Sequence, residues 1–226
     1  MRKYPIGNLY SWFLLRVCVL LCACSDDDYH YPSVKLEFLT AYSDAEGGLQ
    51  YVVTDEGDKY PIWAGVDDWR ITPDSLIRIV SNYEIMQTDG VEGVRLYSAL
   101  AAVSSLPLPA ESFEGEIMTD PADVLSIWMG RDYLNMMLEV KAQNRPHEFF
   151  FVEESRMIDV ENHHASVSLL LYHDDGDDIQ AYTKRAYCSV PLRHYVEEGV
   201  ETVTVHFSVY TYSGEVKKYE FEYKPL

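Results

Sequence analysis

Twelve short segments of this chain are rich in β-branched and aromatic residues, and runs of turn-forming residues separate them. Segments such as residues 34–40 and 202–210 alternate apolar and polar residues, which is typical of strands with one face in a core. No long segment has the 3.6-residue period of a helix. The pattern therefore predicts an all-β protein. The predicted strands are residues 34–40, 49–54, 59–64, 76–84, 94–100, 124–129, 133–140, 147–153, 165–173, 182–192, 202–210 and 216–223.

Five of these segments precede a proline-containing stretch and seven follow it. Pro107 and Pro109 favour extended backbone and remove hydrogen-bond donors, which is typical of a linker. We therefore place a domain boundary within residues 105–121. The seven later segments are spaced as in an antiparallel β-sandwich. Residues 99–103 could alternatively form a helical turn.

The first 23 residues have the pattern of a secretory signal peptide. Their charged residues are Arg2, Lys3 and Arg16, all basic, and a short apolar run follows over residues 17–23. This run is shorter than the ~20 apolar residues that span a bilayer. We predict a signal peptide over residues 1–23. An ordinary signal peptide with an incidental Cys, or an N-terminal anchor helix, is the alternative.

The residues around the predicted cleavage site resemble a bacterial lipobox. In Leu21-Cys22-Ala23-Cys24, a leucine and a small residue precede the cysteine that such proteins acylate. The resemblance implies a covalent lipid, such as palmitate, on Cys24, and two or three chains suffice to hold a protein on a membrane.

The acidic residues after Cys24 form a predicted tether over residues 24–32. Like charges keep such a segment hydrated. The residues also resemble the export signal of outer-membrane lipoproteins that face the cell exterior in some Gram-negative bacteria. We therefore expect a lipid-anchored protein of the outer membrane, at the cell surface. The residues of this signal are Ser25, Asp26, Asp27 and Asp28.

Acidic residues dominate the composition. The chain has 37 Asp and Glu against 18 Lys and Arg, a formal net charge of −19. The leader contributes three basic residues and no acidic ones, so the mature chain is more acidic still. Such a charge disfavours nucleic acid as a partner and favours cationic ones. Of the four cysteines, only Cys188 remains free after processing, so we expect no intramolecular disulfide and a small buried side chain at that position.

The arrangement of leader, two strand blocks and linker resembles the NigD-like lipoproteins. The resemblance depends on residues 21–28, Asp132-Tyr133-Leu134-Asn135, the hairpin of residues 169–177, and residues 203–223. It implies an OB-like five-stranded β-barrel over residues 33–110 and a seven-stranded β-sandwich over residues 120–226. The family is associated with bacteriocin genes, and an immunity role has been supposed. The resemblance brings no active site.

A cluster of acidic residues at one predicted turn is a candidate metal site. Carboxylates around Gly176 could bind Ca²⁺, which takes oxygen ligands. Their spacing differs from that of an EF-hand, and Asp-Gly is also a strong turn signal, so a solvated hairpin turn is the alternative. The candidate ligands are Asp174, Asp175, Asp177 and Asp178.

Four aromatic residues of the first block are candidates for ligand binding. OB-type barrels bind oligosaccharides on one face, and sugars stack on aromatic rings. Packing in the core and at strand edges is the alternative, because strands select aromatic residues anyway. The four are Tyr51, Tyr60, Trp63 and Trp69.

The sequence carries no nucleophile elbow, P-loop, dinucleotide fingerprint or zinc-protease motif. We therefore expect a monomeric, non-catalytic binding or accessory lipoprotein without a cofactor beyond its lipid. A bacteriocin-immunity factor that sequesters a cationic toxin is one alternative, and a glycan-binding or glycan-active surface protein is another. A cationic peptide, a glycan or an envelope protein would be the partner.

Overall fold

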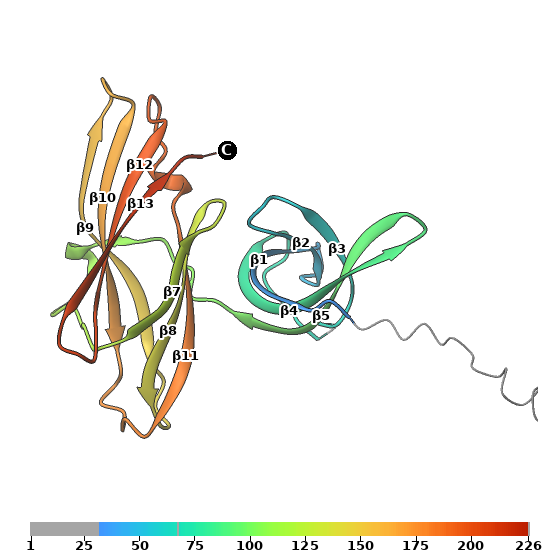
Figure 1. The fold of residues 1–226 in the computed structure, drawn as a ribbon, viewed down its shortest axis with the longest axis horizontal. Coiled ribbons are helices and arrows are strands. Elements are labelled where there is room, and N and C mark those ends of the chain that lie inside the picture. Colours follow the sequence, from blue (N-terminus) through green and yellow to red (C-terminus); the bar gives the residue numbers. More distant parts are fainter. Residues whose placement is uncertain (1–31, 67, 226) are drawn as a thin grey trace, which may run out of the picture. The chain divides into compact units, whose positions relative to one another are not determined.

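The computed structural model describes residues 32–66 and 68–225. Residues from Val34 onward form one compact unit, in which nearly all regular structure is β-strand (Figure 1). This confirms the all-β prediction. The predicted lipid site Cys24 and the export residues Ser25–Asp28 lie outside the described residues.

The first five strands close into a barrel with the order β1-β2-β3-β5-β4. All neighbours are antiparallel except β3 and β5, which are parallel. This confirms the predicted OB-like five-stranded barrel. The strands are β1 (Lys35–Ser43), β2 (Leu49–Val53), β3 (Lys59–Ala64), β4 (Leu76–Thr88) and β5 (Val91–Ala101).

Apolar side chains that alternate along the strands fill the barrel. Leu39, Val52, Ile79 and Leu96 are buried there. Tyr83 is also buried, and its hydroxyl donates to the Glu37 carboxylate at 2.6 Å. Residues 99–101 belong to β5, so the alternative of a helical turn at residues 99–103 is wrong.

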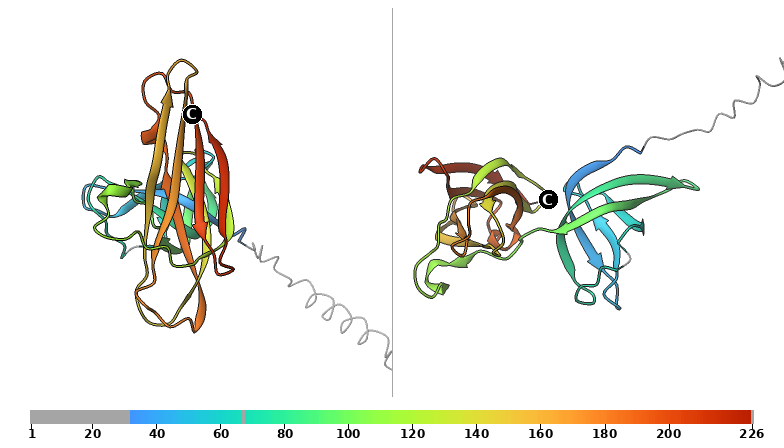
Figure 2. Two further views of the ribbon diagram at one scale, coloured as in Figure 1. Left: turned by 90° about the vertical axis from the view of Figure 1, so that its left-hand side faces the viewer. Right: turned by 90° about the horizontal axis from the view of Figure 1, so that it is seen from below.

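The remaining strands form two sheets that lie face to face (Figure 2). One sheet has the order β13-β12-β10-β9-β6, and the other has the order β11-β8-β7. Two short 3₁₀ helices, η1 (Ala110–Ser112) and η2 (Arg193–Tyr195), interrupt the strand sequence. The strands are β6 (Leu108–Pro109), β7 (Asp123–Met129), β8 (Tyr133–Ala142), β9 (Glu148–Asp159), β10 (His164–Asp174), β11 (Tyr182–Pro191), β12 (Thr202–Tyr210) and β13 (Val216–Tyr223).

The seven predicted strands of the sandwich are present as β7 to β13, with two differences in pairing. The linker contributes the extra strand β6, which pairs in parallel with β9. Strands β10 and β12 are also parallel, because the intervening β11 lies in the opposite sheet. The domain ranges 33–110 and 120–226 remain a prediction.

Side chains from both sheets meet in one core. Leu134, Met136 and Leu138 on β8 face Leu169 on β10 and Phe207 on β12, and all five are fully buried or nearly so. Because this core fills the space between the sheets, a binding site in this part of the chain would have to lie on the outer faces of the sheets or on the loops.

Candidate functional site

Arg78 on β4 lies at the centre of the contact between barrel and sandwich. Its neighbours Ile77 and Ile79 pack in the barrel core, so its side chain points to the outer face of the barrel. It is nevertheless only 2% exposed, because the sandwich covers that face. Its Nη2 donates to Asp55 Oδ1 at 2.5 Å, and its Nε donates to Ser189 Oγ at 3.0 Å.

Asn135 on β8 completes this network. Its Oδ1 accepts hydrogen bonds from Arg78 Nη2 at 3.1 Å and from Ser189 Oγ at 2.7 Å. Its Nδ2 donates to Asp55 Oδ2 at 2.7 Å. Arg78 Nη1 also donates to Thr40 Oγ1 at 3.1 Å. Thr40, Asp55, Arg78, Asn135 and Ser189 are together called the Arg78 cluster below. The cluster satisfies a buried guanidinium with partners from both parts of the chain, as burial of a charge requires.

Two features of the β7–β8 turn bring the sandwich close to the barrel. A Cβ at Gly130 would overlap the Asp55 carboxylate and the Asn135 amide, so only glycine leaves room for this approach. The ring of Tyr133 lies under the guanidinium of Arg78, with 4.2 Å from Cζ to the ring centroid. Two residues of the Asp132–Asn135 stretch, Tyr133 and Asn135, therefore contact Arg78 directly.

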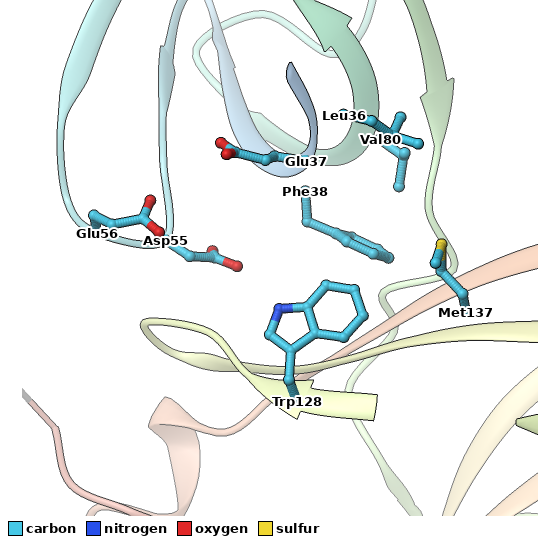
Figure 3. A pocket seen from close by; sticks show the side chains of 8 residues that line it. All are labelled: Leu36, Glu37, Phe38, Asp55, Glu56, Val80, Trp128 and Met137. Carbon is cyan, nitrogen blue, oxygen red and sulfur yellow. The ribbon is translucent and has the colours of Figure 1, made fainter. Parts of the chain in front are cut away.

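A cavity of about 280 Å³ opens beside the Arg78 cluster (Figure 3). Three carboxylates lie on one side of it, and the nitrogen edge of the Trp128 indole faces them. The other side is apolar. We call it the acidic cavity, and it is lined by Leu36, Glu37, Phe38, Asp55, Glu56, Val80, Trp128 and Met137.

The apolar wall of the acidic cavity is firmly packed. Phe38 is 4% exposed and meets Trp128 edge to face, with ring centroids 5.5 Å apart. Trp128 itself is 36% exposed, so one side of its ring is available to a ligand. The wall thus combines a rigid aromatic surface with access from solvent.

The three carboxylates of the acidic cavity are in different environments. Asp55 is ion-paired with Arg78, and Glu37 accepts the Tyr83 hydroxyl. Burial, followed by this hydrogen bond, raises the pKa of Tyr83 well above its usual range. Glu56 is exposed. This arrangement of carboxylates can bind a cation.

A second cavity of about 340 Å³ shares only Asp55 with the first. Three of its lining side chains are cationic, namely Lys59, Arg131 and Arg193. We call it the basic cavity, and it is lined by Thr40, Tyr42, Val53, Thr54, Asp55, Gly57, Lys59, Arg131, Asp132, Tyr133 and Arg193.

The four predicted aromatic residues do not share one face. Tyr60 and Trp69 pack against the barrel core. Tyr51 stacks on Tyr42 at 4.6 Å, beside the basic cavity. Trp63 lines a separate cavity of about 310 Å³ together with Arg70. Alternation along β3 directs Tyr60 inward and Trp63 outward.

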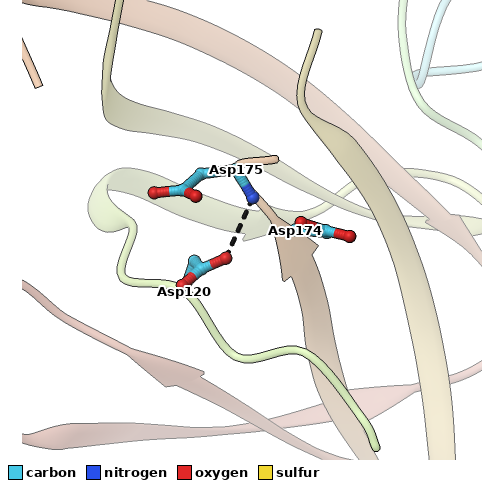
Figure 4. Close-up of side chains that lie close together, drawn as sticks. All are labelled: Asp120, Asp174 and Asp175. Carbon is cyan, nitrogen blue, oxygen red and sulfur yellow. Dashed lines mark hydrogen bonds between the residues drawn. The ribbon is translucent and has the colours of Figure 1, made fainter. Parts of the chain in front are cut away.

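The predicted metal ligands are likewise divided. Asp174 and Asp175 have carboxylate oxygens within 4.8 Å of each other and of Asp120. Asp120 accepts the backbone N–H of Asp175 at 2.9 Å (Figure 4). Asp174 accepts the N–H of Gly176 at 2.8 Å. These carboxylates therefore stabilise the turn, and Asp120 was not predicted because it lies in a loop over fifty residues earlier in the chain.

Asp177 and Asp178 lie outside this group. Asp177 is exposed and adopts a positive φ of 55°. The Asp178 carboxylate accepts backbone N–H groups of Gln143 and Asn144, at 2.5 and 3.2 Å. Burial alone would raise the pKa of Asp178, but these and further backbone N–H groups outweigh it and hold the pKa well below its usual range.

His173 and His147 form a short chain of contacts that ends at Asp178. His173 Nδ1 is 2.9 Å from the carbonyl oxygen of Asp120 and donates to it. His173 Nε2 then accepts from His147 Nδ1, also at 2.9 Å. Burial lowers the pKa of His173 and so favours its neutral form. His147 Nε2 faces Asp178 Oδ2 at 3.6 Å.

Within the described ranges there is no helix with the length and hydropathy to cross a bilayer.

Comparisons with known proteins agree with this architecture. Residues 105–223 match the family model of the NigD-like C-terminal beta sandwich domain. A NigD-like immunity protein from Bacteroides caccae is 34% identical, with a TM-score of 0.73 over 88% of this chain and 100% of that chain. No match was found among curated proteins.

Two more distant structures share the fold. A protein from Parabacteroides distasonis, described as a candidate toxin-related protein, is 19% identical with a TM-score of 0.63, covering 85% of this chain and 94% of that one. A candidate lipoprotein from Bacteroides fragilis is 12% identical with a TM-score of 0.57, covering 85% and 99%. At these identities the likeness shows the fold alone.

Proposed function

Because this chain belongs to the NigD-like family, we propose that it is a non-catalytic binding lipoprotein of the cell envelope. Its lipid on Cys24 anchors it in the outer membrane, and the acidic signal Ser25–Asp28 directs it to the cell surface. The binding role is supported mainly by the acidic cavity, in which a carboxylate wall lies opposite an aromatic wall.

The chemistry of the acidic cavity suits a cationic and partly apolar peptide segment. A Lys or Arg side chain entering the cavity would meet the carboxylates of Glu37 and Glu56. Unlike Asp55, neither of these carboxylates is ion-paired with Arg78. The stem of the same side chain, or an apolar neighbour, would pack on Trp128 and Phe38. A cation next to the Trp128 ring gains further from its π face.

Binding to a synthetic peptide tests this role. Full-length protein in detergent micelles is titrated calorimetrically with a peptide of alternating lysine and leucine, and with a glutamate–leucine peptide as the control. We expect binding of the first peptide only. Glu56→Gln should weaken it about three- to tenfold, because one charge contact of roughly 1 kcal/mol is lost. Glu46→Gln, which removes an exposed carboxylate of the β1–β2 turn, should leave it unchanged.

Two results would count against the cavity as the binding site. One is equal affinity for the anionic peptide. The other is an equal loss of affinity in the Glu56 and Glu46 variants, because a diffuse surface charge would then account for binding.

Immunity to a cationic bacteriocin is a second candidate function. The similar protein from Bacteroides caccae is described as a NigD-like immunity protein, and the acidic cavity has the charge to hold such a toxin. Toxin spotted on cells with the gene, without it, and with the Glu56→Gln variant separates this role from other binding roles. Equal killing of all three strains would exclude it.

The proposed lipid anchor and cell-surface location can be tested without knowing the ligand. Growing cells are labelled with an alkyne analogue of palmitate, and intact cells are then treated with proteinase. We expect the wild-type chain to be labelled and to be degraded from outside, and Cys24→Ala to be unlabelled. A chain that is unlabelled and released into the medium would contradict the lipid anchor.

A further inference from the structure

The basic cavity is an exception in a strongly acidic chain. Lys59 comes from β3 of the barrel, while Arg131 and Arg193 come from the sandwich. Only 18 Lys and Arg are present among 226 residues, so three around one cavity of about 340 Å³ are a marked local concentration. The volume lies within the roughly 300–1,000 Å³ of small-molecule sites.

The cations of the basic cavity are partly neutralised. Asp132 Oδ2 is ion-paired with both arginines: it lies 4.0 Å from Arg131 Nε and accepts a hydrogen bond from Arg193 Nη1 at 3.5 Å. Its other oxygen accepts the Tyr223 hydroxyl at 2.7 Å. Asp55, the second acid, is ion-paired with Arg78. The lining therefore retains donor capacity for an anion.

Two of the three cations lie against the backbone or a ring beside them. The Arg131 guanidinium lies against Gly57, where an added Cβ would come within 2.7 Å of Nη1. Gly57 has φ +99°, a conformation that other residues rarely adopt, so the loop keeps this space open. The Lys59 ammonium lies 3.6 Å from the centroid of the Tyr51 ring.

The rest of the lining has the groups that recognise a sugar ring. Tyr42 lines the cavity and stacks on Tyr51, with ring centroids 4.6 Å apart. Burial, followed by the neighbouring Tyr51 and Tyr133, raises the pKa of Tyr42, so its hydroxyl remains a donor. Thr40 and Thr54 add hydroxyls, and Asp132 can accept from a sugar hydroxyl.

We infer that the basic cavity binds a saccharide bearing a carboxylate, with Arg131 and Arg193 holding the carboxylate and Tyr42 packing on the ring. Arginine forks match a carboxylate in two parallel hydrogen bonds, which a neutral sugar cannot provide. The ring wall and the hydroxyls distinguish this ligand from a simple anion. The site is separate from the acidic cavity proposed to hold a cationic peptide.

The test uses full-length protein in detergent micelles and three probes. Trigalacturonate is the acidic saccharide, the trisaccharide of galactose is its neutral counterpart, and acetate is the simple anion. We expect calorimetric binding of trigalacturonate that is at least tenfold tighter than that of either control, and that weakens in 1 M salt because ionic contacts are screened.

Substitutions inside and outside the basic cavity test where trigalacturonate binds. Arg131→Gln and Arg193→Gln should each weaken trigalacturonate binding about tenfold, the loss of one charge-assisted contact. Lys217→Gln and Lys218→Gln remove the same charge from exposed positions on β13 and should leave affinity unchanged. Thermal unfolding of every variant shows whether it is folded. Glu56→Gln should also leave saccharide binding unchanged, which separates this result from the peptide experiment.

Three outcomes would overturn the inference. The first is equal binding of the neutral trisaccharide, which would remove the role of the carboxylate. The second is acetate competing at the same concentration as trigalacturonate, which would make the cavity a general anion site. The third is affinity that is unchanged in folded Arg131 and Arg193 variants.

Discussion

The acidic and basic cavities are built in the same way but have opposite charge. Each has one wall from the barrel and one from the sandwich, and both include Asp55. The sandwich contributes neutral Trp128 and Met137 to the first and cationic Arg131 and Arg193 to the second. The difference shows that a formal net charge of −19 does not determine the charge of a site. A few side chains at the contact between the barrel and the sandwich do.

The Arg78 cluster supports both cavities at once. Asp55 belongs to the loop between β2 and β3, and its two oxygens are bound by Arg78 and by Asn135. The same loop contributes Glu56 to the acidic cavity and Gly57 to the basic one. The geometry of both cavities therefore depends on this cluster being intact.

Removing Arg78 should disturb both cavities at once. Arg78→Ala leaves Asp55 without its ion-pair partner in a largely buried setting, which should cost about 3–5 kcal/mol of unfolding free energy. The melting temperature should fall by on the order of 10 °C. Both the lysine–leucine peptide and trigalacturonate should lose affinity, because the β2–β3 loop would move. Denaturant unfolding and calorimetry measure the two effects.

Arg185→Ala is the matched control, because Arg185 is an exposed arginine on β11. It should change stability by no more than about 0.5 kcal/mol. If the Arg78 and Arg185 variants were equally stable, the buried cluster would contribute nothing to the contact between the barrel and the sandwich.

Truncating Trp128 should affect one cavity only. Trp128→Ala removes a partly exposed ring that packs on Phe38, which should cost about 1–2 kcal/mol. The peptide should bind about tenfold more weakly, since it loses its aromatic wall. Saccharide binding should be unchanged, and a parallel loss of both ligands would show that the cavities are not independent.

Acidification should change stability through a group that lies in neither cavity. The pKa of His173 is lowered by burial from its ordinary value of 6.5, so the unfolded chain takes up its proton first as the pH falls. Stability is therefore fully present above about pH 6.5 and is lost as the pH falls from there towards the folded-state pKa. Urea unfolding at several pH values measures this slope.

His173→Gln should flatten the slope between pH 7 and 5. A smaller slope of the same sign should remain, because burial also lowers the pKa of His194. If the variant kept the whole slope, His173 would not be the group responsible. Binding experiments on the two cavities are best compared above pH 6.5, where this effect is absent.

Local patterns in the sequence predicted the strands well. The bounds of β3, β12 and β13 agree with the predicted segments because alternation and turn residues are properties of the segment itself. The pairing of β6 with β9, and of β10 with β12, depends on residues far apart in the chain and was not predicted. Such pairing leaves no local signal.

The site was harder to predict than the fold, and Arg78 shows why. Alternation in Leu76-Ile77-Arg78-Ile79 correctly indicates that Arg78 faces away from the barrel core, where solvent is the usual environment. The sandwich covers that face instead. A period of two identifies the outer face of a strand but carries no information about what packs on it. The predicted aromatic residues lie apart on the barrel, whereas Asp174 and Asp175 lie together with Asp120 from a distant loop, which no local pattern could indicate.

The burial of Cys188 has a practical consequence. It is the one cysteine among the described residues, it is fully buried, and burial raises its pKa to about 12. A thiol of this kind hardly reacts with maleimides at neutral pH. A second cysteine introduced on an exposed loop would therefore accept a fluorophore selectively, without first replacing the native one. Dyes placed at the rims of the two cavities would report on each ligand by its own change in emission.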